Sequence, residues 1–260
     1  MGRIADENAG DWRASLRERG YAHFSRVVPQ PLVDAARAAI AEDLRLRYDA
    51  AREREYGSRT YCPGIVAARP IVDLIEQPPV RGILDEAIGF DALGRSDGQI
   101  AIRWAHNVDR EFAPSWHIDG VSSPDNGVAP GALDTLTAIV GVFLTTQPRA
   151  FAGNLTVWPG SHERLARHFR ERGPQSLYEP LPELDLGAPE QLVCEAGDVV
   201  LLHYLTAHDA AVNTSGVDRI AVYFRTLLRA IDDGRWDRWE CLAEPWRGWR
   251  LSDASSNAGL

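Results

Sequence analysis

The spacing of apolar residues changes at about residue 99, and this change constrains the fold more than any other feature of the chain. Before it, apolar side chains recur at i, i+4 intervals from Pro31 to about Asp49, a pattern typical of an amphipathic helix. After it, apolar residues alternate with threonine and glycine between Thr135 and Leu144, which indicates a β-strand. A helical block followed by many strands predicts a mainly β fold with helices. We expect a double-stranded β-helix core (a cupin-like jelly roll) with the N-terminal helices packed on one sheet.

The same patterns predict individual elements. Helices are expected over Asp11–Arg19, Pro31–Asp49, Ile71–Glu76 and Val80–Ile88, and strands over Tyr21–Phe24, Leu136–Leu144, Gln191–Cys194, Val199–His203 and Arg219–Leu228. We expect one domain over residues 1–260, with a helical part at 1–98, a jelly-roll core at 99–230 and a C-terminal extension at 231–260. Two long irregular stretches, Val121–Gly131 and Glu171–Glu190, are candidate lids, because long loops inside a compact domain are often functional.

Composition narrows the possible partners. The formal charge of −9 argues against binding to nucleic acid or to anionic membranes, both of which attract basic surfaces. All 28 basic residues are arginine, so Schiff-base and P-loop chemistry that depends on lysine is excluded. We therefore expect a small-molecule substrate, no nucleic acid and no membrane partner, while the oligomeric state stays unknown.

Cysteine usage and the N-terminal residues indicate a cellular compartment. The three cysteines are odd in number and have no CxxC spacing, which is typical of reduced thiols rather than of a disulfide framework or a zinc site. The N-terminus has no basic segment followed by an apolar one, and no apolar run is long enough to span a bilayer. These features predict a cytoplasmic protein.

Three residues form a candidate metal site. His117 and Asp119 are one residue apart, so on an extended backbone both side chains point to the same side. His208, far downstream, completes two histidines and one carboxylate, the facial triad that binds Fe(II) and leaves positions open for a cosubstrate and O2. His203 lies on the same stretch as His208 and is an alternative ligand.

An arginine downstream of His208 is a second kind of candidate site residue. Arg219 begins a predicted strand on which Arg219, Tyr223 and Arg225 share one face. The planar guanidinium group pairs well with a carboxylate, as a 2-oxoglutarate-dependent enzyme requires. We expect this face to point inward, although an outward face with solvated arginines is the simpler alternative.

Longer motifs make the chain similar to a known family. Trp116–Gly120 encloses the first two candidate ligands, and Gly153–His162 is close to the most specific internal signature of that family. Together with Gly20–Phe24, the Gly197-Asp198 strand, His208 and Arg219, they show that the chain resembles the phytanoyl-CoA dioxygenase family of Fe(II)/2-oxoglutarate oxygenases over nearly its whole length.

The resemblance implies both cofactors and an activity. It implies a jelly roll in which His117, Asp119 and His208 bind Fe(II), Arg219 binds the C5 carboxylate of 2-oxoglutarate, and O2 is the oxidant. A dioxygenase of this kind oxidises an unactivated C–H bond by hydroxylation or oxidative cyclisation. We expect a bacterial specialised metabolite as substrate, such as a sugar-containing antibiotic intermediate. A lipid or acyl thioester hydroxylase and a non-oxygenase metal-binding jelly roll, such as a cupin-like isomerase or sensor, are the alternatives.

The chain also departs from the family pattern. A hydroxyl that contacts the cosubstrate in some relatives is replaced by Ala210, and lysine contacts are absent. Arg103, Thr137 and Trp158 are expected to take over cofactor contacts. Arg225 and Tyr223 are candidate substrate contacts, and a structural carboxylate is the alternative partner of Arg225. Related halogenases carry a small residue at the position of Asp119, so oxidation without halogen transfer is expected here.

Overall fold

The protein is described by a computed structural model that covers residues 11–105, 115–122, 128–134, 137–181 and 183–251. The helices are α1 (Trp12–Arg19), α2 (Gln30–Arg47), α3 (Glu53–Ser58), α4 (Arg69–Glu76), α5 (Val80–Ala87), α6 (Ser161–Arg172), α7 (Arg229–Asp232) and α8 (Arg238–Ala243). The strands are β1 (Tyr21–Phe24), β2 (Gly98–Arg103), β3 (Ala138–Phe143), β4 (Leu155–Val157), β5 (Glu190–Gln191), β6 (Val199–His203), β7 (His208–Ala210) and β8 (Arg219–Thr226).

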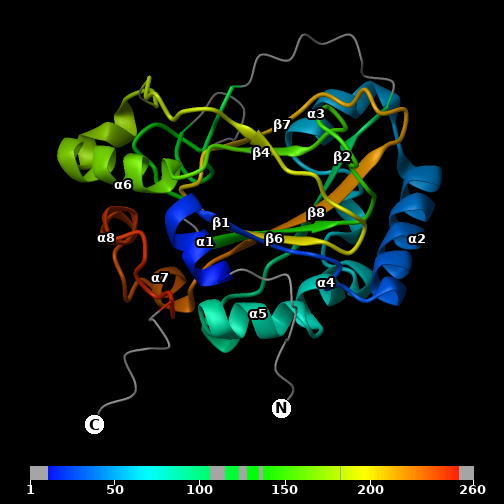
Figure 1. Ribbon diagram of the computed structural model, residues 1–260, viewed down its shortest axis with the longest axis horizontal. Helices are drawn as coiled ribbons and strands as arrows, with labels where there is room; N and C mark the ends of the chain where they lie inside the picture. Colours follow the sequence, from blue (N-terminus) through cyan, green and yellow to red (C-terminus); the bar gives the residue numbers. More distant parts are fainter. Residues whose placement is uncertain (1–10, 106–114, 123–127, 135–136, 182, 252–260) are drawn as a thin grey trace.

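These strands form two facing sheets, as Figure 1 shows. The larger sheet has the order β1-β6-β3-β8-β2 and the smaller one the order β5-β4-β7, and the paired strands are antiparallel. The strand β1 comes from the first hundred residues, yet it pairs with β6 at one edge of the larger sheet. Two antiparallel sheets enclosing one interior agree with the predicted jelly-roll core.

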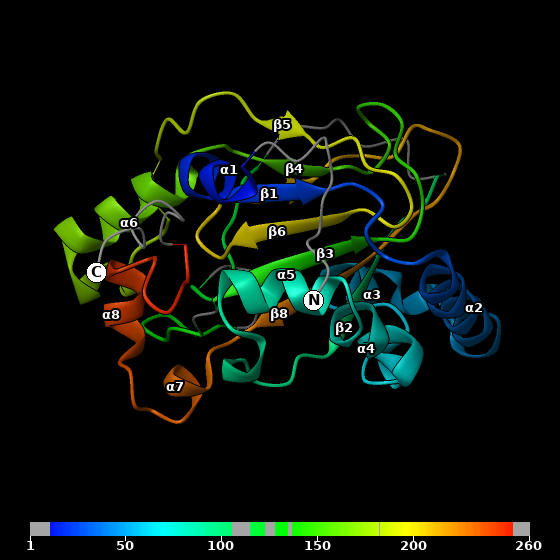
Figure 2. The same ribbon diagram turned by 60° about the horizontal axis from the view of Figure 1, so that its bottom comes forward.

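A layer of helices covers the outer face of the larger sheet. In Figures 1 and 2, α2, α4 and α5 lie on the side of this sheet that faces away from β4 and β7. Their apolar stripes, including Val33, Ile40 and Leu74, pack with Val140 of β3 and Phe224 of β8 in one buried cluster. The predicted packing of the N-terminal helices on one sheet is therefore what the structure shows.

The opposite, inner face of the larger sheet carries the polar residues of interest. Neighbouring side chains on a strand point to opposite faces. Since Val222 and Phe224 pack against the helices, Arg219, Tyr223 and Arg225 of β8 face the interior. The predicted inward orientation of this face is thus correct. It also explains why all six residues of β3 are buried, since helices cover one face of β3 and the interior encloses the other.

Most predicted elements are present, with shifted ends. Asp11 caps α1 by accepting a hydrogen bond from the backbone N–H of Arg13. The predicted strand over Gln191–Cys194 is largely wrong, because only Glu190–Gln191 pairs regularly, with β4, and Cys194 makes an isolated bridge to Gln147. Leu136, part of the predicted strand before Leu144, and part of the candidate lid Val121–Gly131 lie outside the described residues.

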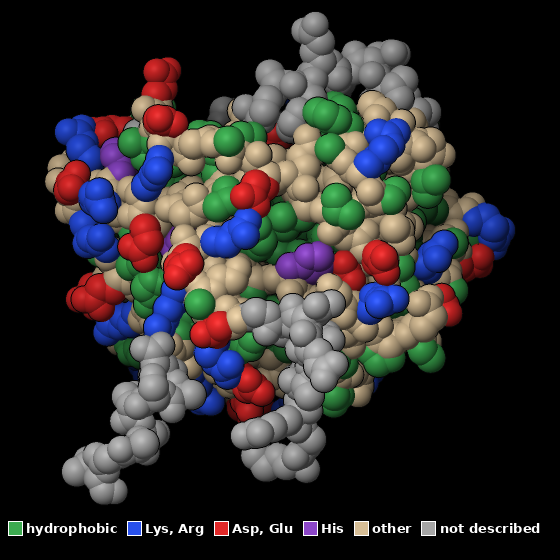
Figure 3. Space-filling model, in the orientation of Figure 1, with side chains coloured by type: hydrophobic (Ala, Val, Ile, Leu, Met, Phe, Trp, Pro, Cys, Tyr) green, Lys and Arg blue, Asp and Glu red, His purple; other side chains and the backbone are tan. Residues whose placement is uncertain are grey.

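The C-terminal extension packs onto the core. Trp236, Trp246 and Trp249 pack against the buried cluster between the larger sheet and its helices, and Trp239 packs near Phe169 of α6. In the described part of the chain, no helix is long and apolar enough to cross a membrane. Figure 3 shows acidic and basic side chains interspersed over the face in view.

Candidate functional site

His117 and His208 are brought together by backbone pairing. The N–H of His117 donates to the carbonyl of His208 at 3.1 Å, and the N–H of His208 donates to the carbonyl of His117 at 3.0 Å. This bridge extends the smaller sheet beyond β7, and the two imidazole rings lie side by side with centroids 4.4 Å apart. Directly opposite residues of an antiparallel pair project their side chains to the same face. The fold therefore places both rings on one side of the sheet.

The third candidate ligand lies beside them. The Oδ2 atom of Asp119 is 4.0 Å from Nε2 of His208, and potential ligand atoms of all three side chains lie within 4.8 Å of one another. His208 Nδ1 lies 2.9 Å from the carbonyl oxygen of Thr206, so a proton on Nδ1 leaves Nε2 free to bind a metal. The three residues predicted from the sequence are thus close together, and their role as ligands stays a prediction.

The surroundings of His117 and Asp119 keep these two side chains in the protonation states that metal binding requires. Burial, followed by the neighbouring His208, lowers the pKa of His117 to about 3, so its imidazole is neutral at neutral pH. Burial raises the pKa of Asp119, but Arg225 and then His208 outweigh this effect and bring the pKa below its ordinary value. Two imidazoles and one carboxylate, with His117 neutral and Asp119 ionised, form a donor set that fits Fe(II).

Arg219 is buried without a carboxylate partner among the described residues. Its side chain is 2% exposed, its Nε donates to the carbonyl of Gly153 at 2.7 Å, and its Nη1 donates to that of Ala101 at 3.1 Å. Burial lowers the pKa of Arg219 to about 10, which still leaves the guanidinium charged at neutral pH. Since an unpaired buried charge is costly, this arrangement favours an anion that binds from outside the chain.

Gly153 closes over this arginine. A Cβ atom at Gly153 would lie 2.9 Å from Cβ of Arg103 and 3.0 Å from Cβ of Arg219, and the backbone has φ +75°. Glycine is therefore required at position 153 for two reasons, the left-handed backbone conformation and the close approach of the segment before β4 to two arginines.

This requirement gives a stability prediction. Gly153→Ala is expected to lower the free energy of unfolding by more than Gly187→Ala, whose φ of +79° is similar but whose Cβ would meet no atom within 4 Å. The backbone strain common to both costs about 1 kcal/mol or more, and the contact with two arginines adds to it only at Gly153. Urea unfolding of both variants measures the difference, and equal losses would contradict the close packing at Gly153.

The other interior residues predicted as contacts lie along the same strand pair. Arg103 is the cross-strand partner of Arg219, and it lies close enough to His117 to contribute to lowering the pKa of that ring. Tyr223 pairs with Gln99 of β2 and Gly141 of β3, and its ring meets Phe143 edge to face. Arg225 donates from Nε to Oδ2 of Asp119 at 2.7 Å.

Thr137 and Trp158 are less well placed for the predicted cofactor contacts. The hydroxyl of Thr137 already accepts a hydrogen bond from the backbone N–H of Leu228. Trp158 is 5% exposed and belongs to a cluster with Ile118, Leu165 and Phe169, beside α6. These packing roles provide no support for the predicted cofactor contacts, which remain untested.

The competing histidine, His203, lies elsewhere. It is on β6, fully buried, with Nε2 2.7 Å from the carbonyl oxygen of Pro245, and its Nδ1 accepts a hydrogen bond from the N–H of Leu205. Its ring packs against Trp246 and Trp249, so it anchors the C-terminal extension. His162 is likewise structural, since its Nε2 lies 2.9 Å from the carbonyl oxygen of Arg17. Ser161, the first residue of α6, accepts a hydrogen bond at its hydroxyl from the N–H of Ala207.

The buried His203 predicts a pH dependence of stability. Burial lowers its folded-state pKa to about 3, while an unfolded histidine titrates near 6.5. Below pH 6.5 the unfolded state binds the additional proton, so stability is complete above that pH and is lost as pH falls toward 3. Between pH 6.5 and pH 3 we expect His203→Gln to reduce the pH dependence of the free energy of unfolding by about 1.4 kcal/mol per pH unit, the contribution of one proton. Urea unfolding at pH 7.5 and pH 5 tests this, and an unchanged slope would contradict it.

A second group of potential ligands consists of His23, Cys194 and Asp198. Asp198 is already satisfied, because Oδ1 accepts from the N–H of Arg26 and Oδ2 accepts from the N–H of Glu195 and lies 2.8 Å from His23 Nε2. Burial raises the pKa of Cys194, so its thiol stays protonated. This group ties the loop after β1 to the turn before β6, and the donor set does not favour a metal.

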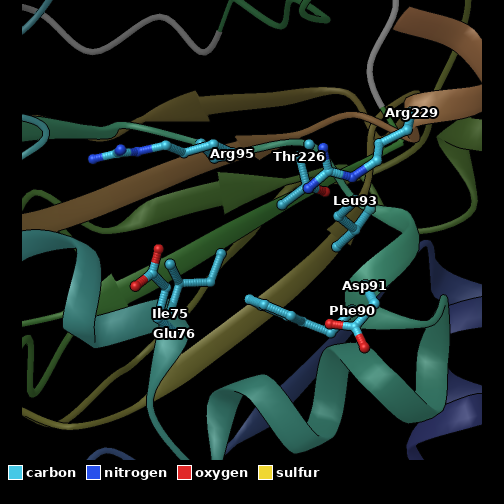
Figure 4. Close-up of a pocket in the computed structure, with 10 residues that line it drawn as sticks. Ile75, Glu76, Phe90, Asp91, Leu93, Arg95, Thr226 and Arg229 are labelled. Carbon is cyan, nitrogen blue, oxygen red and sulfur yellow. The ribbon is translucent and has the colours of Figure 1, made fainter. Parts of the chain in front are cut away.

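One cleft lies on the helical side of the larger sheet and does not include His117, Asp119 or His208. Figure 4 shows residues from α4, the segment 90–96 and the start of α7 around it, among them Glu76, Asp91, Arg95 and Arg229. Its volume of about 210 Å³ is below the range of typical ligand pockets, and its lining has charges of both signs. None of the candidate site residues line it, so we assign it no role.

The fold and the donor set together define a class. A jelly roll whose interior holds a His-Asp-His cluster and a buried arginine is the architecture expected of a non-haem metal enzyme that binds an acidic cosubstrate. The model of the phytanoyl-CoA dioxygenase family matches residues 16–221, and the chain belongs to that family. The family resemblance inferred from the sequence is therefore confirmed. No curated protein sequence matches the chain.

Solved structures show the same fold. The non-heme α-ketoglutarate-dependent epimerase SnoN from nogalamycin biosynthesis is 17% identical, with a TM-score of 0.56, over 83% of this chain and 79% of its own. The carbocyclase SnoK from the same biosynthesis is 24% identical, with a TM-score of 0.54, over 91% and 95%. HygX from Streptomyces hygroscopicus, with nickel and 2-oxoglutarate bound, is 17% identical, with a TM-score of 0.55, over 85% and 87%.

Proposed function

We propose that the protein is an Fe(II)- and 2-oxoglutarate-dependent dioxygenase that oxidises a C–H bond of a small molecule. The observation that carries the proposal is that one jelly-roll interior contains both a potential metal site and an arginine without an acidic partner among the described residues. The ligand atoms of His117, Asp119 and His208 lie within 4.8 Å of one another, and Arg219 is buried without a carboxylate partner among the described residues. Family membership supports the same reading.

Each residue has a proposed role. His117, Asp119 and His208 would hold the iron, which when bound with 2-oxoglutarate and O2 supplies the oxidising power for C–H cleavage. Arg219 would bind the far carboxylate of 2-oxoglutarate through charge-assisted hydrogen bonds, with Arg103 adding positive potential from the neighbouring strand. The apolar lining of the interior, including Phe143 and Leu155, would exclude water from the reacting atoms.

We further propose that the substrate is a bacterial specialised metabolite, such as a sugar-containing antibiotic intermediate. SnoN and SnoK are enzymes of nogalamycin biosynthesis, and one is an epimerase while the other is a carbocyclase. The fold thus accommodates several outcomes of C–H oxidation, and hydroxylation and oxidative cyclisation are both open to this chain. The family description, phytanoyl-CoA dioxygenase, favours a fatty acyl thioester as the second candidate.

The first experiment is an anaerobic titration of Fe(II)-loaded protein with 2-oxoglutarate. A weak visible charge-transfer band is expected as the cosubstrate chelates the metal, and Asp119→Ala should lose it. If the wild-type protein develops no band, the oxygenase proposal is wrong, and a non-oxygenase metal-binding jelly roll becomes the better reading. A positive result leads to a substrate screen in which succinate formation is measured with glycosylated metabolites and with acyl thioesters.

A further inference from the structure

We infer that Arg225 is a positioning residue for the metal centre, acting through Asp119. This inference rests on the proposed function and deepens it. Arg225 holds Oδ2 of the Asp119 carboxylate, the oxygen that lies 4.0 Å from Nε2 of His208, and so fixes the direction in which this carboxylate faces the histidines.

The contacts around Arg225 carry the inference. Its Nε donates to Oδ2 of Asp119 at 2.7 Å, in an ion pair in which the aspartate side chain is only 13% exposed. Its Nη1 donates to Oε1 of Gln99, and the amide of Gln99 in turn donates to the carbonyl of Arg59. The guanidinium is therefore fixed at two of its nitrogens, between a candidate metal ligand and the neighbouring strand β2.

The planar arginine side chain suits this task. Its nitrogens donate in fixed directions, so one edge can hold the carboxylate while another is held by the glutamine. A carboxylate with one oxygen engaged in a strong, charge-assisted bond has little freedom to turn or to bind a metal with both oxygens. Groups that orient metal ligands in this way typically change metal affinity by about 10- to 100-fold when they are removed.

Removing Arg225 has two opposing effects on metal affinity, and the test must separate them. The positive charge of Arg225 repels a cation, so removing it favours metal binding, whereas loss of the orientation of Asp119 disfavours it. Only the second effect passes through Asp119. A double-mutant cycle between the two residues therefore isolates it.

The experiment is a calorimetric titration of the apo protein with Ni(II), a metal that imidazole ligands suit, so we expect measurable binding to the two histidines in Asp119→Ala as well. We expect Arg225→Met to weaken Ni(II) binding by about 10- to 100-fold in the wild-type background. In the Asp119→Ala background the same substitution should leave binding unchanged or strengthen it. Arg225→Lys, which keeps the charge and loses the planar fork, should also weaken binding, and Gln99→Leu should do so to a smaller degree.

Each alternative result is decisive. An equal change in Ni(II) affinity on Arg225→Met in both backgrounds would overturn the inference, since such a change does not pass through Asp119. Thermal unfolding of each variant identifies misfolded protein. If Arg225→Met is misfolded, Gln99→Leu provides the test, and unchanged Ni(II) affinity in Gln99→Leu would count against the inference. If the wild-type protein binds no Ni(II), the proposed metal site itself fails; if it binds Ni(II) and Arg225→Met changes the affinity equally in both backgrounds, only the role of Arg225 fails.

Discussion

Replacing His208 with alanine is expected to weaken metal binding by more than about 100-fold. This loss exceeds the change in metal affinity that usually follows removal of a group that only orients a ligand. His208 pairs with His117 through two backbone hydrogen bonds, and its Nδ1 contact with the Thr206 carbonyl leaves Nε2 for the metal. Removing this imidazole leaves one histidine and one carboxylate. Turnover of 2-oxoglutarate should disappear with the metal, which a Ni(II) titration and an assay for succinate can measure in parallel.

His203→Gln is the matched control for this prediction. His203 lies five residues earlier, but it is on the helical side of β6, where its ring packs against Trp246 and Trp249. We expect this variant to lose stability and to keep the metal affinity of the wild-type protein. Loss of metal binding in His203→Gln with retention in His208→Ala would exchange the two roles and contradict the proposed triad.

Replacing Arg219 with leucine is expected to raise the dissociation constant of 2-oxoglutarate while metal binding remains. Removing one partner of a buried charge pair costs about 2–5 kcal/mol, and each 1.4 kcal/mol is about tenfold, so the expected weakening is roughly 30- to 3,000-fold. The buried guanidinium and its contacts with two backbone carbonyls are the reason to expect the upper part of this range. The charge-transfer band, titrated with 2-oxoglutarate without oxygen, gives the constant directly.

Two variants make this prediction specific. Arg219→Lys keeps a positive charge without the planar fork and should fall between wild type and leucine. Arg95→Leu removes an arginine from the cleft on the helical side of the larger sheet and should leave the constant unchanged. If Arg219→Leu binds 2-oxoglutarate as wild type does, another group holds the carboxylate, and Arg103 on the neighbouring strand is the first to test.

Local sequence determined much of the fold. The helices α1, α2, α4 and α5 and the strands β1, β6 and β8 follow from apolar periodicity and capping residues, because these depend on spacing along one element. The strands β4, β5 and β7 have two or three residues each, too few to show a periodic pattern. They exist because they pair with one another and close the smaller sheet over the interior.

For the candidate site, too, the sequence determined one part and the tertiary structure the other. The sequence indicated His117, Asp119, His208 and Arg219, because the residue types and the alternation of side chains along strands restrict the chemistry. It left open whether His203 competes with His208, and it did not indicate that Arg225 would pair with Asp119. Both points depend on which face of a strand turns toward which sheet, and only the packing of two sheets and a helical layer determines that. The close approach of Gly153 to two arginines, and the network from Gln99 through Arg225 to Asp119, join strands far apart in sequence and therefore exist only in the tertiary structure.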